Sequence, residues 1–145
     1  MKRDIKSLEE MEKFAGELLE KLNKISPSSS ATVLALHGDL GAGKTAFVKS
    51  LAKILGVSET VQSPTFVIMK MYEISYKSFK KLIHVDAYRI ENDRELEVVG
   101  WDELIKDPKN LICIEWPKQV KDLIPNSAIQ IDFSFVDETT RSVRM

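Results

Sequence analysis

Residues 38–45 read Gly-Asp-Leu-Gly-Ala-Gly-Lys-Thr and fit the pattern of Gly, any four residues, then Gly-Lys-Thr. This pattern is typical of a loop whose backbone N–H groups surround a polyphosphate. Glycines at 38, 41 and 43 permit the backbone angles and the close approach that such a loop needs. We expect the Lys44 ammonium to reach the β and γ phosphates and the Thr45 hydroxyl to face Mg²⁺.

The residues on either side of this loop favour a strand before it and a helix after it. Residues 32–37 form a short apolar run suited to a buried parallel strand. After the loop, apolar residues recur at helical spacing until Gly56, namely Phe47, Val48, Leu51, Ala52 and Leu55. This order favours a nucleotide site over a glycine-rich structural turn. The predicted nucleotide-binding residues of the loop are Asp39, Leu40, Gly41, Ala42, Gly43, Lys44, Thr45 and Ala46.

Length, charge and cysteine content narrow the class of protein. A chain of 145 residues that is 43% hydrophobic predicts one domain over residues 1–145. A net charge of −1 argues against an autonomous nucleic-acid binder. The charged start and the lack of a run of ~18 apolar residues predict a cytoplasmic protein without a membrane span. Cys113 is the only cysteine, and its apolar surroundings indicate core packing rather than a catalytic thiol.

Periodicity predicts the remaining elements. A capping box at 7–10 and an apolar stripe predict a helix over roughly 8–24. Further on, the sequence predicts extended segments at 67–74 and 81–86 around a turn at 75–78. It also predicts short helices at 95–100 and 101–107, whose buried side is formed by Leu96, Val99, Trp101, Leu104 and Ile105. A strand at 111–114 follows, and the alternation at 129–135 predicts a strand that turns back into 141–145 as an antiparallel hairpin at the sheet edge.

Two of these predicted strands end in a carboxylate. Apolar residues lead into Asp86 in one strand and into Glu115 in the other. Because the carboxyl ends of parallel strands meet at one edge of a sheet, both acids are expected beside the bound phosphates. Asp86 is the candidate Walker B acid, with helix capping as the alternative. His84 alternates with the core and is expected to pack rather than react.

The segment Ser63-Pro64-Thr65 lies between the loop-bearing helix and the next strand. Many folds of this kind place the segment that senses the γ-phosphate there, so Thr65 could contact the metal or the attacking water. A Ser-Pro turn with a threonine at the start of a strand explains the same residues.

Four linked motifs give the chain a close resemblance to the bacterial TsaE (YjeE) family of small ATPases. They are the loop at 38–45, Ser-Pro-Thr-Phe at 63–66, His-Val-Asp-Ala-Tyr-Arg at 84–89 and Glu-Trp at 115–116. The order and approximate spacing are those of the family, and the resemblance covers nearly the whole chain. Ala46 and Lys49-Ser50 depart from residues that many relatives carry, but neither removes a phosphate or metal ligand.

The resemblance implies an α/β P-loop NTPase fold of three layers, with a mainly parallel central sheet and antiparallel edge strands. It also implies a Mg²⁺-dependent ATPase, weak alone and stimulated by its partners TsaB and TsaD, that helps to form N6-threonylcarbamoyladenosine at position 37 of tRNAs reading ANN codons. TsaD would carry the transfer chemistry, ATP hydrolysis would reset the complex between turnovers, and tRNA would be met only through the complex. Thr45, Glu115 and Asp86 would serve the metal, with Asp86, Glu115 and Thr65 as catalytic residues.

Other interpretations stay open from sequence. A small-molecule kinase shares the loop and the length, although the five arginines, at 3, 89, 94, 141 and 144, do not cluster in a lid. A GTP switch is disfavoured because no Asn-Lys-x-Asp motif follows the loop, and a non-enzymatic module would use nucleotide only to fix a docking surface. Trp116 is expected to cover the nucleotide or to face TsaD. Arg89 is expected to bind a partner or to pair with an acid such as Glu95.

Overall fold

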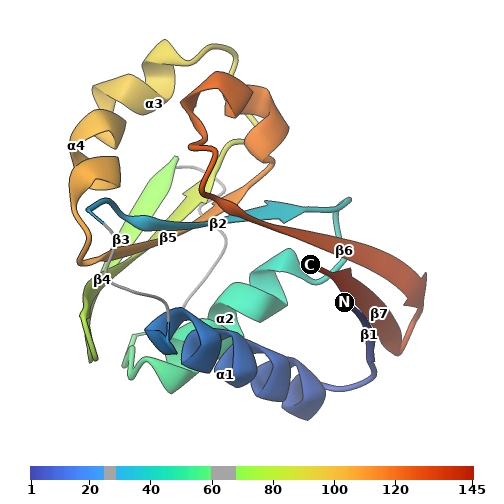
Figure 1. Ribbon diagram of the computed structural model, residues 1–145. Helices are drawn as coiled ribbons and strands as arrows, with labels where there is room; N and C mark the ends of the chain where they lie inside the picture. Colours follow the sequence, from blue (N-terminus) through green and yellow to red (C-terminus); the bar gives the residue numbers. More distant parts are fainter. Residues whose placement is uncertain (25–28, 60–67) are drawn as a thin grey trace.

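The computed structural model describes residues 1–24, 29–59 and 68–145. Helices and strands are interspersed along this part of the chain (Figure 1), in an order that begins with the strand β1. Their bounds are β1 Lys2–Ile5, α1 Leu8–Lys24, β2 Thr32–His37, α2 Lys44–Ile54, β3 Met69–Tyr76, β4 Phe79–Asp86, α3 Arg94–Val98, α4 Trp101–Lys106, β5 Asn110–Glu115, a 3₁₀ helix Pro117–Leu123, β6 Ile129–Asp137 and β7 Thr140–Arg144.

The described strands form one mixed seven-stranded sheet in the order β1-β7-β6-β2-β5-β4-β3. The four central strands β6, β2, β5 and β4 run parallel, whereas β3, β7 and β1 each pair antiparallel with their neighbours. The predicted α/β fold, with a mainly parallel sheet and antiparallel strands at its edges, is therefore confirmed. In Figure 1 the arrow of β2 points to the right, so the carboxyl ends of the parallel strands lie on that side.

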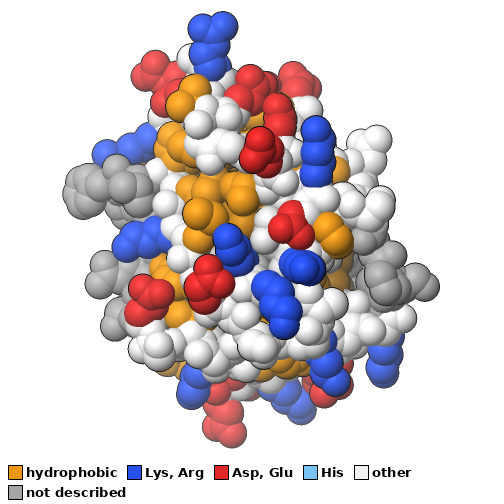
Figure 2. Space-filling model, turned by 90° about the vertical axis from the view of Figure 1, so that its left-hand side faces the viewer, with side chains coloured by type: hydrophobic (Ala, Val, Ile, Leu, Met, Phe, Trp, Pro, Cys, Tyr) orange, Lys and Arg blue, Asp and Glu red, His pale blue; other side chains and the backbone are white. Residues whose placement is uncertain are grey.

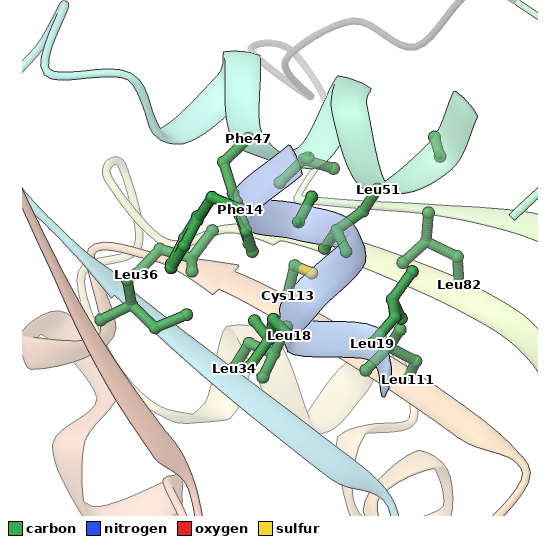
Figure 3. Packing of buried hydrophobic residues seen from close by; sticks show 14 of the residues in the cluster. Phe14, Leu18, Leu19, Leu34, Leu36, Phe47, Leu51, Leu82, Leu111 and Cys113 are labelled. Carbon is green, nitrogen blue, oxygen red and sulfur yellow. The ribbon is translucent and has the colours of Figure 1, made fainter. Parts of the chain in front are cut away.

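Helices α1 and α2 cover one face of the sheet. Parallel strands that are buried on both faces read as continuous apolar runs, as β2 and β5 do. Phe14 packs against Phe47 with ring centres 5.6 Å apart, and Phe47 against Phe133 at 5.4 Å. Figure 3 shows how both helices and the strands fill this layer, with Leu18, Leu19, Leu34, Leu36, Leu51, Leu82, Leu111 and Cys113.

The other face lies under α3, α4 and the 3₁₀ helix, which gives the three layers that the sequence predicts. Alternate residues of the central strands point to this side, among them Val33, Ala35, Ile112 and Ile114. Trp101 is fully buried at the start of α4, and its indole Nε1–H donates to the Leu123 carbonyl at 3.1 Å. This bond ties α4 to the 3₁₀ helix.

Three local predictions were wrong. The N-terminal segment forms β1, which pairs with β7 at four positions, so the β6–β7 hairpin is not at the sheet edge. The turn predicted at 75–78 is shorter, because β3 continues to Tyr76. Val99 is 42% exposed rather than buried, since α3 ends at Val98 and Val99 is its C-cap residue, while Leu104 and Ile105 are half-buried.

No helix in the described part of the chain is both long and apolar enough to cross a membrane. Figure 2 shows the side of the molecule that lies to the left in Figure 1. Hydrophobic side chains gather in the middle of this side, with Asp and Glu mostly above them and Lys and Arg below. The carboxyl ends of the parallel strands, and with them the site described next, lie on the opposite side.

Candidate functional site

The glycine-rich loop joins β2 to α2 and adopts a conformation that only glycine fits. Gly38 has φ of 142°, and a Cβ atom there would lie 2.5 Å from the Phe133 carbonyl oxygen. Gly41 and Gly43 also have positive φ, at 80° and 112°. Gly43 is the N-cap of α2, and the first N–H groups of a helix have no partner within it. The loop and helix terminus thus form a concavity suited to an anion.

A cavity of about 820 Å³ opens at this loop. Its polar lining includes Lys44, Asp86 and Glu115, together with Thr45 from the first turn of α2. Its apolar lining includes Ile5, Leu8 and Met11 from the start of the chain and Leu40, and the turn between β6 and β7 also borders it. The predicted loop residues 40, 41 and 43–46 line the cavity; Ala42 is buried, and its N–H donates to the Asp39 carbonyl at 3.1 Å.

Lys44 is 4% exposed, and its Nζ donates to the Gly38 carbonyl of the same loop. The same Nζ lies 3.7 Å from the centre of the Trp116 ring. Burial lowers the pKa of Lys44, although the carboxylates of Glu115, Asp86 and Asp39 act in the opposite direction. The ammonium is therefore a buried cation held at the mouth of the loop among acids, without a direct ion pair among the described residues.

The two predicted strand-end carboxylates lie side by side. Asp86 and Glu115 are register partners in the parallel pair of β4 and β5, and both line the cavity. The Ala87 N–H donates to the Glu115 carbonyl at 3.0 Å, which keeps the strand ends paired. Asp86 accepts the Tyr88 N–H on Oδ1 at 3.0 Å, so it also caps the turn after β4. The metal-site interpretation of Asp86 stays a prediction, whereas helix capping does not fit, because Asp86 caps a turn and α3 begins only at Arg94.

His84 contributes more than the predicted core packing. Its side chain is fully buried, and its Nε2 lies 2.6 Å from Oε2 of Glu115, which is itself only 5% exposed. The His84 Nδ1 has no hydrogen-bond partner among the described residues. The sequence prediction was incomplete because alternation shows that His84 faces inward but not that it meets Glu115 of the next strand.

Trp116 lies between a cation and a second aromatic ring. The centre of the Tyr88 ring lies 5.0 Å from that of Trp116, with 51° between the ring planes, and the Lys44 ammonium lies 3.7 Å from the Trp116 ring centre. Trp116 has φ of 57°, an uncommon conformation for a residue with a side chain. Gln119 donates to the Tyr88 carbonyl at 3.2 Å, which links the two aromatic segments.

Arg89 lines the cavity and is exposed. The structure shows no ion pair between its guanidinium and Glu95, although both residues are described. Glu95 instead accepts the N–H groups of Glu91 at 2.7 Å and Asn92 at 3.2 Å, as an acid in the first turn of a helix does. Thr65, the remaining predicted site residue, lies outside the described residues.

Arg141 was missed by the sequence analysis and reaches the loop. Its Nε donates to the Gly41 carbonyl at 2.8 Å and its Nη1 to the Asp137 carbonyl at 2.7 Å. Its guanidinium carbon lies 4.6 Å from the centre of the Phe135 ring. Arg141 thereby holds the loop against the β6–β7 hairpin. No local signal marks this contact, because the two partners are 100 positions apart.

The residues present fit a magnesium nucleotide. No group of three or more His, Cys, Asp or Glu side chains in the described part of the chain forms a complete metal cage. Mg²⁺ does not need one, since it is commonly held by one or two carboxylates, phosphate oxygens and water. Glu115, Asp86 and Thr45 supply hard oxygen donors in the lining of the cavity that also contains the lysine.

A glycine cradle before a helix, a buried lysine and two strand-end acids on a mainly parallel sheet define a P-loop protein of the α/β class. The sequence profile described as "Threonylcarbamoyl adenosine biosynthesis protein TsaE" matches residues 5–143. The chain belongs to the TsaE family.

Individual relatives agree with this assignment. The TsaE protein of Aquifex aeolicus is 34% identical over 143 residues, which are 97% of this chain and 92% of that protein. The TsaE protein of Bacillus subtilis is 37% identical over 111 residues, 77% of this chain and 66% of that protein. The crystal structure of Bacillus subtilis YdiB is similar, with a TM-score of 0.74 and 28% identity over 99% of this chain and 82% of that one.

Proposed function

We propose that this protein binds and hydrolyses ATP with Mg²⁺ in the pathway that forms N6-threonylcarbamoyladenosine on tRNA. Membership in the TsaE family supports the pathway. The glycine cradle, Lys44 and the paired acids support the nucleotide chemistry. Such sites act mainly by positioning the phosphates and by stabilising charge, so the fixed polar and charged groups that line the cavity are the elements that matter.

The proposed roles of the residues follow from their places in the cavity. Loop N–H groups and the Lys44 ammonium bind the β and γ phosphates. Thr45, Glu115 and Asp86 would hold Mg²⁺, which would supply positive charge to offset that of the phosphates. Asp86 is proposed to orient the attacking water from this site, as is Thr65 on the family resemblance alone, and Trp116, whose ring lies against the Lys44 ammonium, to cover the nucleotide.

The observation that carries the proposal is the register of β4 and β5. It places Asp86 directly beside Glu115 in the lining of the cavity, and the charges of both carboxylates act on Lys44. A glycine-rich structural turn would not need two acids next to a buried lysine, because each buried charge costs free energy unless it is compensated. Compensation by a metal and phosphates accounts for all three charged groups together.

The proposal includes the partners TsaB and TsaD and a cytoplasmic setting. Tyr88 and Arg89 are exposed at the cavity, next to Trp116, and could be reached by another protein while nucleotide is bound. Hydrolysis would then reset the TsaB–TsaD complex between turnovers, and tRNA would be met only through that complex.

A small-molecule kinase is the second candidate. Two arginines line the cavity, which is a feature of such enzymes. However, Arg89 and Arg141 come from separate elements, and Arg141 is held by loop and hairpin carbonyls rather than by a mobile lid. These contacts favour the ATPase.

Glu115→Gln tests the proposed function, because it keeps the shape of the side chain and removes its charge. Loss of one fixed electrostatic group should lower turnover by ~10²–10³ while ATP still binds through Lys44 and the loop. Turnover is measured as phosphate release with and without TsaB and TsaD. Glu103→Gln, an exposed acid on α4, is the matched control. Unchanged turnover in Glu115→Gln would overturn the site, and stoichiometric phosphoryl transfer to a metabolite would favour the kinase.

A further inference from the structure

The buried contact between His84 and Glu115 lies directly behind the proposed metal site. His84 is on β4 and Glu115 ends β5, and the adjoining register pair is His84 with Cys113. The His84 side chain is 0% exposed, so it cannot itself touch a ligand in the cavity. Its contact with Glu115, at 2.6 Å, is therefore the route by which it can affect the site.

The direction of this hydrogen bond follows from the chemistry of the two groups. An ionised carboxylate only accepts, so Nε2 carries the proton that is donated to Oε2 of Glu115. The opposite nitrogen, Nδ1, is buried and has no hydrogen-bond partner among the described residues. No described group thus competes with Glu115 for this imidazole, and the carboxylate has a fixed neighbour on the side away from the cavity.

We propose that His84 is a positioning residue that fixes Glu115 by occupying Oε2 and leaves Oε1 as the oxygen that meets Mg²⁺. The proposal rests on the proposed function of Glu115 as a metal ligand. Carboxylates that bind metals depend on such hydrogen bonds for their orientation, and loss of the partner typically lowers metal affinity 10–100-fold.

The arrangement also favours Mg²⁺ over Ca²⁺. With Oε2 engaged by His84, Glu115 offers one oxygen and cannot easily bind a cation through both. Mg²⁺ suits single-oxygen carboxylate contacts in a compact octahedron, whereas Ca²⁺ accepts two oxygens of one carboxylate in a larger and more flexible shell. Freeing Oε2 should therefore weaken the preference for Mg²⁺.

Two variants separate positioning from a role in packing alone. His84→Leu fills the space but removes the donor, while His84→Gln restores an N–H donor near the place of Nε2. Binding of a non-hydrolysable ATP analogue is titrated with Mg²⁺ and with Ca²⁺, and thermal unfolding is followed alongside. His84→Leu should bind the analogue without metal as tightly as the parent does. It should need about tenfold more Mg²⁺ for metal-dependent binding and should lose part of the parent's preference for Mg²⁺ over Ca²⁺. His84→Gln should recover most of the Mg²⁺ affinity and most of the preference.

The proposal would be overturned if His84→Leu responded to Mg²⁺ and to Ca²⁺ as the parent does. It would also be overturned if His84→Gln bound Mg²⁺ no more tightly than His84→Leu. An NMR measurement on the protein without metal or nucleotide keeps the test independent of the proposed function. The imidazole of His84 should show a proton on Nε2, deshielded by Glu115, and Glu115→Gln should shift that signal. If the parent shows no metal-dependent nucleotide binding, the proposed function fails; a proton on Nδ1 instead of Nε2 refutes the contact itself.

Discussion

Lys44 lies with its ammonium nitrogen 3.7 Å from the centre of the Trp116 ring while it donates to the Gly38 carbonyl. The loop lysine is thus held in the cavity by a π face on one side and by its own loop on the other. Tyr88 packs on Trp116 and is exposed, whereas Lys44 is buried, so the three side chains form a row of contacts that runs from the buried lysine to the surface. Replacement of each member should have a separate effect on nucleotide binding.

Trp116→Ala should weaken ATP binding by the isolated protein about tenfold, because an ammonium on a partly desolvated ring is worth about 1–2 kcal/mol. Trp116→Phe keeps a weaker π face and should lie between the two. Titration with an ATP analogue checks both variants. Normal affinity with lost stimulation by TsaB and TsaD would instead assign Trp116 to the partner surface.

Lys44→Met should abolish productive ATP binding, because loop N–H groups alone cannot offset the β and γ charge. The fold should survive, since burial lowers the pKa of Lys44 and its charged form therefore destabilises the folded state. A folded pKa below the ordinary value of 10.5 means that the unfolded chain binds the proton more tightly. The parent should accordingly gain stability relative to Lys44→Met as pH rises toward 10.5, a trend that urea unfolding at several pH values can measure.

Lys49→Met is the control for that variant, because Lys49 is exposed on the same helix. It should bind ATP like the parent. ATP hydrolysis by Lys44→Met at the rate of the parent would show that the loop is not the phosphate site.

Arg141→Ala should weaken ATP binding about tenfold by releasing the Gly41 carbonyl, since a hydrogen bond from a charged donor contributes about 1.5–3 kcal/mol. Arg144→Ala removes an exposed arginine from the same strand and is the matched control. Analogue titration should separate the two variants. An equal effect in both would assign the loss to net charge rather than to the loop contact.

Much of the fold follows from local pattern in the sequence. The apolar runs of β2, β4 and β5 and the stripes of α1 and α2 lie where periodicity predicts, because burial on one or both faces requires that spacing. β1 escaped prediction because only Ile5 among its four residues is apolar and buried. It forms through backbone pairing with β7 at the far end of the chain, which local sequence does not encode.

The site also combines features that local sequence predicts with contacts that it does not. The loop and the two strand-end acids are local patterns, and the structure brings them to one cavity. The contacts of His84 with Glu115 and of Arg141 with Gly41 join residues 31 and 100 positions apart. Such contacts depend on strand order and register, which are fixed only when the whole sheet assembles.

Cys113 should resist alkylation in the folded protein. It is completely buried between the helices and the sheet, and burial raises the pKa of its thiol, so the reactive thiolate is scarce. Iodoacetamide labelling followed by mass spectrometry should rise in parallel with urea unfolding. Rapid labelling of the folded protein would contradict the packing of this layer.

Gly38→Ala should destabilise the protein more than a glycine substitution that only strains the backbone. A Cβ atom at this position would lie 2.5 Å from the Phe133 carbonyl oxygen, and φ of 142° is itself strained for alanine. Strained backbone alone costs about 1–3 kcal/mol, and here β6 must also move away from the loop. Urea unfolding should therefore show a lower free energy of unfolding, and ATP binding should fall because the cradle is displaced.

Gly56→Ala is the matched comparison for Gly38→Ala. Gly56 also has a positive φ, 83°, but an added Cβ would meet no atom within 4 Å. It should lose only the backbone contribution, about 1 kcal/mol, and keep full ATP affinity because it lies beyond α2, away from the loop. Equal losses in the two variants would show that close approach of β6 to the loop does not matter, and the cradle would then depend on backbone angles alone.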